Sequence, residues 1–307
     1  VWSTDLTPAG ENSDDASGGG LSVAGGTVFA STGFGELRAL NIRDGAELWR
    51  QRLGAAVTGA PTVDGKLVYV STRAGQGWAI DTESGRVEWI VRGVPSQSGI
   101  EGGSAPAVGS SLAIFPLSSG EVLGVFKKGG LMRWQSSAVG ARHGLAYADV
   151  TDITGDPVIG NGTIYVGNSA GRTVALDPST GERRWTAGEG ALGSLVLAGN
   201  SLFTISDRFQ LVRIDTRNGQ RIWAIDLPGA RQDSEWRGVQ YHAQSGPVLA
   251  GGLLWVGSAS GHLNGFDPVN GALRHSIELP AGAATRPIVV NNTLYIVNTA
   301  GQLLAFR

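Results

Sequence analysis

The stretch Val174-Ala175-Leu176-Asp177-Pro178-Ser179-Thr180-Gly181-Glu182-Arg183-Arg184-Trp185 reads as an apolar strand, a tight turn and a second strand that carries a tryptophan. Asp177 can accept hydrogen bonds from backbone N–H groups two or three residues later, and Gly181 can adopt the left-handed conformation that closes the turn. Trp185 then presents a large apolar face from the second strand. The stretch therefore predicts a β-hairpin with an aromatic side chain on its outer strand.

The same hairpin recurs along the chain. Its tryptophan returns at positions 2, 49, 89, 134, 185 and 223, and His275 takes the next place. The turn residues recur with it, as in Asn41…Gly45…Trp49, Asp81…Gly85…Trp89, Asp215…Gly219…Trp223 and Asp267…Gly271…His275, with a weaker copy at Gly130…Trp134. Periods of about 40 to 50 residues are typical of four-stranded propeller blades.

The placement of proline supports the same architecture. Each period begins with an expected innermost strand, and proline falls in several of these strands, at Pro61, Pro106, Pro157, Pro247 and Pro287. Since proline cannot donate a hydrogen bond to a central ladder, it indicates an edge strand, and the innermost strand of a blade is such an edge. A parallel β-helix is the competing repeat fold, but its coils are shorter and do not need this hairpin. We therefore predict an all-β fold, a β-propeller of four-stranded antiparallel blades.

Seven repeats are visible, and residues 1–307 are interpreted as a single propeller domain. The repeats span approximately 19–54, 58–93, 103–139, 155–190, 193–229, 245–282 and 285–307. Val1-Leu6 reads as an orphan outer strand with Trp2 in the motif position, while the last repeat has no fourth strand. Either this strand pairs with Leu303-Phe306 and closes a ring of seven blades, or it is the remnant of a lost first blade.

Composition narrows the possible functions. Glycine is abundant at 48 residues and charged residues make up only 16%, which fits an all-β chain with many tight turns. The net charge of −2 gives no electrostatic reason to expect nucleic acid as a partner. The chain has no cysteine, so disulfides, thiolate metal sites and cysteine nucleophiles are excluded. No apolar run approaches the length of a transmembrane segment.

The repeat Ala-x-Asp-x-x-Thr-Gly-x-x-x-Trp, matched by Ala175 to Trp185, resembles that of quinoprotein-type propellers. Within that superfamily the whole chain is similar to the BamB family, the propeller lipoproteins of the outer-membrane β-barrel assembly machinery. Gly103-Ser104-Ala105-Pro106, Ala148-Asp149-Val150 through Pro157, and Gly188 to Asp207 carry the resemblance. The family has eight blades, so the resemblance favours an eight-bladed propeller that lacks most of its first blade and the N-terminal lipidated cysteine.

The resemblance implies a non-enzymatic scaffold at the periplasmic face of the bacterial outer membrane. It would bind the POTRA domains of BamA through inter-blade loops and assist unfolded outer-membrane protein clients, without a cofactor or a metal. Carried onto this sequence, the family's contact loops give Gly99, Ile100, Glu101, Asp149, Asp152 and Thr154 as partner-binding residues. Where the family pattern tends to Leu-x-Leu-Arg, this chain has Ser98, Ile100 and Glu101, which reverses a charge and puts that contact in doubt.

Tryptophan, aspartate and histidine often form ligand or metal sites, but most of those in the repeats are expected to have structural roles. We expect Trp49, Trp89, Trp134, Trp185 and Trp223 to pack between neighbouring blades, because their regular recurrence is typical of core positions. The aspartates at the repeated turns serve those turns rather than a shared calcium ion. His275 replaces a motif tryptophan and is expected to pack, whereas Trp236 lies in a long loop as a second candidate contact.

Two other functions remain open. A quinoprotein dehydrogenase shares the repeat, but such enzymes look roughly twice as long as this chain and use a calcium ion beside the quinone. The sequence shows no set of convergent carboxylates for that ion. A small-ligand-binding periplasmic propeller, using its central channel, is the other alternative.

Overall fold

The computed structural model describes residues 2–12, 15–16, 18–57, 59–95, 103–140, 152–228, 230–232 and 239–307. Every secondary-structure element in these ranges is a β-strand. None of the described residues belongs to a helix long and apolar enough to cross a membrane. The chain divides into two compact units, Val1–Arg184 and Trp185–Arg307.

The first unit holds antiparallel sheets in which consecutive strands are neighbours. The first sheet contains β1 (Gly19–Ala24), β2 (Thr27–Thr32), β3 (Glu36–Asn41) and β4 (Glu47–Arg52). The second contains β5 (Thr62–Asp64), β6 (Leu67–Thr72), β7 (Gln76–Asp81) and β8 (Val87–Arg92). The third contains β9 (Ala107–Val108), β10 (Leu112–Pro116), β11 (Glu121–Phe126) and β12 (Met132–Ser137). The fourth contains β13 (Val158–Gly160), β14 (Thr163–Gly167), β15 (Thr173–Leu176) and β16 (Arg183–Ala187), whose last residues belong to the second unit.

The second unit repeats the same topology. One sheet contains β17 (Val196–Ala198), β18 (Ser201–Ile205), β19 (Gln210–Asp215) and β20 (Arg221–Asp226). The next contains β23 (Gln244–Ala250), β24 (Leu253–Ser258), β25 (His262–Phe266) and β26 (Leu273–Glu278), and the last contains β27 (Ile288–Val290), β28 (Thr293–Val297) and β29 (Leu303–Phe306). A separate hairpin of β21 (Ala230–Gln232) and β22 (Val239–Tyr241) lies in the connection before β23.

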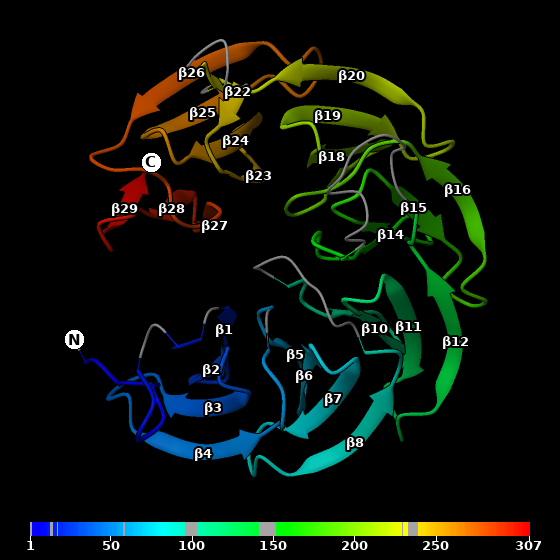
Figure 1. Ribbon diagram of the computed structural model, residues 1–307, viewed down its shortest axis with the longest axis vertical. Helices are drawn as coiled ribbons and strands as arrows, with labels where there is room; N and C mark the ends of the chain where they lie inside the picture. Colours follow the sequence, from blue (N-terminus) through cyan, green and yellow to red (C-terminus); the bar gives the residue numbers. More distant parts are fainter. Residues whose placement is uncertain are drawn as a thin grey trace. The chain divides into compact units, whose positions relative to one another are not determined.

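These sheets are propeller blades. In the first unit the first strands β1, β5, β9 and β13 lie next to one another in sequence order, and in the second unit β17 and β27 both contact β23. Figure 1 shows the strands of the first blade in the order β1-β2-β3-β4. The predicted fold class is confirmed as all-β, with seven blades among the described residues. That an eighth blade is lost stays a prediction.

Burial explains why the strands of a blade differ in sequence. The second and third strands are covered on both faces by their neighbours, and β10 and β14 are buried along their whole length. The sequences of β10 and β14 are therefore nearly continuous apolar runs. The outer strand β4 alternates instead, with Trp49 half-buried between exposed neighbours. The apolar clusters lie between successive blades, as where Phe29 and Leu37 meet Val68 and Val70.

The repeated hairpin has the predicted geometry. The Asp177 carboxylate accepts hydrogen bonds from the backbone N–H of Ser179 at 2.8 Å and of Thr180 at 3.2 Å. Gly181 has a φ of 73° and donates its N–H to the Asp177 carbonyl at 2.9 Å. After the turn, a β-bulge shifts the register between the third and fourth strands, for example at Ala39/Leu40. The residue opposite the tryptophan is small in the first three blades, as in the pairs Ala39–Trp49 and Gly124–Trp134, whereas Arg213 is opposite Trp223 in the fifth.

The prediction for the first strands was wrong in its boundaries. Pro61, Pro106, Pro157 and Pro287 each lie just before a first strand rather than inside it. These strands are short because pairing with the second strand begins only after the proline, which has no N–H to donate. Pro247 alone of these lies within its strand, where the β23–β24 register shifts between Ser245 and Val248.

The N-terminal segment contacts the first blade without forming a strand. Residues 2–6 belong to no sheet, but the Trp2 indole donates its Nε1–H to the Ile42 carbonyl at 2.9 Å. The Thr4 hydroxyl donates to the Gly45 carbonyl at the same distance, 2.9 Å. Trp2 thus occupies the turn of the first blade in the manner of a motif tryptophan.

Candidate functional site

The two ends of the blades in the first unit carry different kinds of connection. The third-to-fourth-strand turns, at residues 41–45, 81–85, 126–130 and 177–181, lie at one end, which we call the turn end. The chain passes from each blade to the next at the opposite end, which we call the connection end. Because strands alternate in direction, the connections from β8 to β9 and from β12 to β13 both start and finish at the connection end. This end is the candidate functional site.

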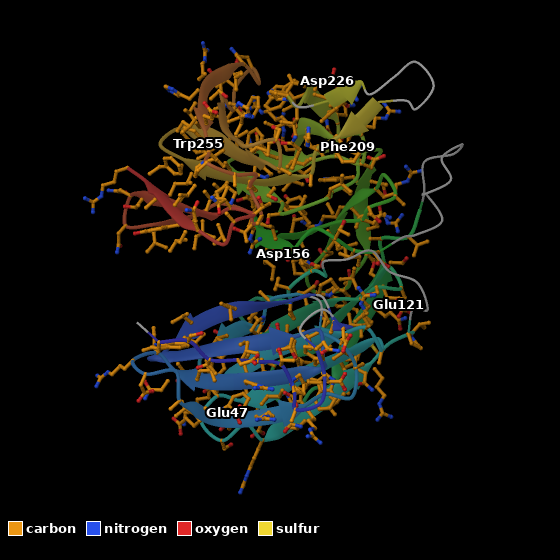
Figure 2. The ribbon with its side chains drawn as sticks, turned by 60° about the vertical axis from the view of Figure 1, so that its left-hand side comes forward. Glu47, Glu121, Asp156, Phe209, Asp226 and Trp255 are labelled. Carbon is orange, nitrogen blue, oxygen red and sulfur yellow. The ribbon has the colours of Figure 1, made fainter. Side chains whose placement is uncertain are left out.

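The connection after β8 is fastened at its start by Glu121, the first residue of β11. The Glu121 carboxylate accepts hydrogen bonds from the Val94 backbone N–H at 2.7 Å and from the Gln135 side-chain amide at 2.5 Å. Gly93 lies so close to this group that an added Cβ would come within 2.4 Å of the Leu117 side chain and 2.9 Å of the Glu121 carboxylate. Figure 2 labels Glu121 in the first unit.

The end of the same connection is fastened by the following blade. Asp156, labelled in Figure 2, accepts a hydrogen bond from the Ala105 backbone N–H at 2.8 Å. The Ser104 hydroxyl, which is buried, donates to the Gly155 carbonyl at 2.9 Å. The motif Gly103-Ser104-Ala105-Pro106 therefore joins the start of one blade to the start of the next. Between Val94 and Ala105 the chain is held at both ends by carboxylates of the third and fourth blades.

Asn168 fastens the connection between β12 and β13. Its side-chain amide donates to the Ala138 carbonyl at 2.9 Å and to the Gly140 carbonyl at 3.0 Å. Further along, Ile153 forms a β-bridge with Asn168 and is 3% exposed within the apolar cluster of the third and fourth blades. Both long connections are thus anchored on rigid strand ends, a common way to hold binding loops.

The predicted partner-binding residues fall into two groups. Gly99, Ile100, Glu101 and Asp149 lie outside the described residues. Asp152 is only 5% exposed, and its backbone carbonyl accepts a hydrogen bond from the Ser169 N–H at 3.0 Å. Thr154 is half-buried. The structure therefore places Asp152 in the base of its connection, where its side chain is buried rather than exposed to a partner.

Sequence reasoning missed Glu121 and Asn168 as residues of this end. Each begins or follows a strand and carries no motif, so nothing local marks it. Trp236, the second candidate contact, lies outside the described residues. His275 is exposed rather than buried, and its ring stacks on Trp255 of its own blade at 6.1 Å, which corrects the expectation of core packing.

The motif tryptophans lie at the turn end, against the hairpin of the following blade. Each indole donates its N–H to a turn carbonyl: Trp49 to Thr82, Trp89 to Lys127, Trp134 to Pro178, Trp185 to Thr216 and Trp223 to Val269, at 2.8–3.0 Å. The ring covers the turn glycine, as Trp134 covers Gly181. The carbonyls and the glycines belong to the same repeated turn, so the contact is the same from blade to blade.

The turn aspartates act within their own hairpins. The pKa of the Asp177 carboxyl lies well below its usual range because the Ser179 hydroxyl and Arg184 donate to it. The Arg217 side chain and backbone N–H lower the pKa of the Asp215 carboxyl to about 2. Within the described part of the chain, no cluster of three or more His, Asp or Glu residues is arranged to hold a metal ion. Each of these aspartates thus stabilises its own turn.

Comparison with known proteins places the chain among propellers of two kinds. The outer membrane protein assembly factor BamB of Shewanella oneidensis is 26% identical over 285 residues, which cover 92% of this chain and 69% of the relative. The crystal structure of BamB from Moraxella catarrhalis superposes with a TM-score of 0.80 at 21% identity, covering 94% of this chain and 84% of the other. A europium-containing methanol dehydrogenase gives a TM-score of 0.66 at 15% identity, covering 93% and 72%.

At these identities the solved structures show a likeness of fold alone. The family comparison goes further, because the family described as outer membrane protein assembly factor BamB matches residues 1–225, most of the sequence. The match takes in the repeated hairpins of the first five blades and the anchored connections of the third and fourth. The chain therefore belongs to the BamB family of outer membrane protein assembly factors.

Proposed function

We propose that this protein is a non-enzymatic scaffold subunit of the outer-membrane β-barrel assembly complex, acting at the periplasmic face of the outer membrane. The observation that carries the proposal is membership of the BamB family over residues 1–225. The connection end supports it, because long loops held at both ends by rigid strands suit the recognition of a partner protein.

We propose BamA as the direct partner, bound through the connection that contains Gly99, Ile100 and Glu101. Val94 and Ala105, which flank this segment, donate their backbone N–H groups to the carboxylates of Glu121 and Asp156. An apolar anchor supplies most of the affinity in such contacts, whereas a charge mainly sets specificity and the association rate. Ile100 is therefore the expected anchor and Glu101 the expected specificity residue.

A titration of the POTRA domains of BamA against variants of both blade ends tests this proposal. The double variant Ile100→Asp, Glu101→Arg removes the anchor and reverses the charge at the connection end. We expect it to weaken binding by tenfold or more, about 1.4 kcal/mol. The matched control is Arg43→Glu, an exposed residue of the first turn-end hairpin, which should bind as the parent does.

Equal binding by the parent and the connection-end variant would remove this loop as the docking site, and a loss with Arg43→Glu would move the contact to the turn end. Asp152→Arg is unsuitable for this test. Because Asp152 is 5% exposed, the substitution would bury a charge and disturb folding, which would mimic a loss of binding.

A further inference from the structure

A groove opens at the turn end between the third and fourth blades. Its volume is about 510 Å³, within the range of small-molecule sites. Five apolar side chains form its walls: Leu112, Ile114, Phe126, Ile159 and Ile164. Leu112, Ile114 and Ile164 are also buried members of the apolar cluster between these blades. The groove thus reaches from the surface into the hydrophobic core.

Ile114 departs from the repeat at the position that shapes this groove. In the other blades the second-strand residue paired with the same third-strand position is aromatic: Phe29, Tyr69, Tyr165, Phe203, Trp255 and Tyr295. That ring commonly lies against the motif tryptophan, as Tyr69 lies 5.9 Å from Trp89. In the third blade Ile114 faces Gly124 instead. Trp134 leans over that glycine, within 2.2 Å of where a Cβ would be.

The mouth of the groove is polar and carries a positive charge. Ser110 and Ser111 come from the β9–β10 turn, and Pro178 and Ser179 from the following hairpin. Arg133 is exposed at the mouth and donates its Nε–H to the Ser179 carbonyl at 3.2 Å. Among the described residues Arg133 makes no ion pair, and no carboxylate lines the groove.

The equivalent groove between the second and third blades differs in both respects. It has a volume of about 440 Å³ and is lined by Tyr69 in place of the isoleucine. Its lining includes two carboxylates, of Asp64 and Glu88, and three ammonium groups, of Lys66, Lys127 and Lys128. Asp64 binds Lys127 at 2.7 Å. The same site in the fold therefore has an aromatic wall and charged groups of both signs in one seam, and an aliphatic wall with one guanidinium and no carboxylate in the next.

From these contrasts we propose that the groove between the third and fourth blades binds a small amphipathic organic anion, a medium-chain carboxylate. Its aliphatic body lies on Phe126 and Ile159, the partly buried apolar side chains of the lining, where apolar surface is removed from water, and reaches toward the buried Ile114. Its carboxylate lies at the mouth, where the Arg133 Nη groups and the hydroxyls of Ser110 and Ser111 donate hydrogen bonds. This site is independent of the proposed function. It lies at the turn end of the blades, opposite the inter-blade connections that we propose to bind BamA.

Calorimetric titration with octanoate and with 1-octanol tests the proposal. The parent should bind octanoate at one saturable site, with a dissociation constant at or below about 1 mM. Ile114→Phe, which restores the aromatic wall of the other blades, should weaken octanoate binding by tenfold or more. Arg133→Gln should weaken octanoate by about three- to tenfold and leave 1-octanol unchanged, because only the anion uses the guanidinium.

Two further variants make the result decisive. Ser111→Phe places a ring at the exposed mouth and should also weaken octanoate binding by tenfold or more. Because Ser111 is exposed, this variant tests the groove even if Ile114→Phe disturbs the packing of Trp134. Arg92→Gln, an exposed arginine on β8, is the matched control and should leave octanoate binding unchanged. The absence of saturable octanoate binding to the parent, or undiminished binding in both Ile114→Phe and Ser111→Phe, would overturn the proposal. Equal losses for octanoate and octanol in Arg133→Gln would overturn the anionic specificity.

Discussion

One contact between neighbouring blades, an indole ring on a glycine, is repeated along the chain. Trp134 lies on Gly181, and the ring is 2.6 Å from where a Cβ would stand. The glycine is required for two reasons, since its φ of 73° disfavours any side chain and the ring leaves no space for one. The indole N–H reaches the Pro178 carbonyl of the same turn at 2.9 Å. Packing and hydrogen bonding thus hold the ring in one place.

A pair of glycine substitutions separates these two reasons. Gly181→Ala and Gly162→Ala both introduce a side chain at positive φ, but Gly162 has no atom within 4 Å of the added Cβ. We expect Gly162→Ala to cost about 1 kcal/mol of unfolding free energy, the strain alone. Gly181→Ala should cost about 1–3 kcal/mol more, because the tryptophan must move. Urea denaturation measures both, and equal costs would show that the indole contact contributes little.

Asp215 makes part of the stability depend on pH. Its carboxylate accepts hydrogen bonds from the Arg217 backbone N–H at 2.9 Å and from the Arg217 Nη2 at 2.6 Å, which lowers its pKa from 3.8 to about 2. A depressed folded-state pKa gives stability that is complete above the unfolded pKa and is lost as the pH falls through the folded value.

The melting temperature of Asp215→Asn should therefore lie below that of the parent at pH 6, and the difference should shrink between about pH 4 and pH 2. Thermal melts across this range, read by circular dichroism, measure the gap. Asn218→Ala, in the same turn, serves as a control for a variant without a titrating group. A constant gap between the parent and Asp215→Asn down to pH 2 would contradict the role of the ionised carboxylate.

At the scale of the element, each strand of a blade has its own environment. The second strand β10 pairs with β11 along its whole length, whereas the first strand β9 makes only the pairs Ala107–Ile114 and Val108–Ala113. The repeated prolines were predicted to lie inside first strands. The repeat located these strands correctly but not their starts. The N–H that proline lacks affects pairing with the neighbouring strand, and the local sequence pattern does not show where that pairing begins.

Hydrogen exchange should reflect this difference. We expect the backbone amides of β10 and β11 to exchange about 100-fold or more slowly than those of β9, since slow exchange follows from full pairing and burial. Mass spectrometry of peptides covering residues 103–126 measures the two rates in one experiment. Comparable protection of β9 would mean that the first strand is held as firmly as the middle of the blade.

At the scale of the whole molecule, one fold is shared by proteins with different activities. The chain resembles both a BamB structure and a europium-containing methanol dehydrogenase, the latter at 15% identity. The blades are stabilised in the same way whatever the surface does, so function depends on the residues that the ends of the blades present. For this protein we propose the anchored connections of the connection end and the groove of the turn end.

The proposal of a non-enzymatic scaffold predicts that the protein does not take up a quinone cofactor. After incubation with pyrroloquinoline quinone and calcium or europium ions, the protein separated by gel filtration should carry no quinone absorbance. The expectation rests on family membership and on the lack of a cluster of His, Asp or Glu among the described residues that could hold the metal. Stoichiometric quinone in the protein peak, followed by alcohol oxidation, would reverse this conclusion.

The sequence alone determined the blade, because each of its parts is local. Asp177, Gly181 and Trp185 lie within one hairpin, and the turn forms from hydrogen bonds two to four residues apart, so the pattern can be read directly. Repetition of the hairpin then indicated the fold class, since so many tryptophans on outer strands are buried only when neighbouring blades pack against one another. The resemblance to the BamB family followed from the same local motifs.

The tertiary structure alone decided which residues are available for function. Asp152 looks like a loop carboxylate in the sequence, but in the structure it is buried. Glu121 belongs to no motif, yet its carboxylate accepts a hydrogen bond from Val94, 27 residues earlier in the chain. Ile114 is an ordinary strand residue until the register aligns it with the aromatic positions of the other blades. These properties depend on contacts between blades, which are set by strand register and by packing across the seams, and no local pattern records them.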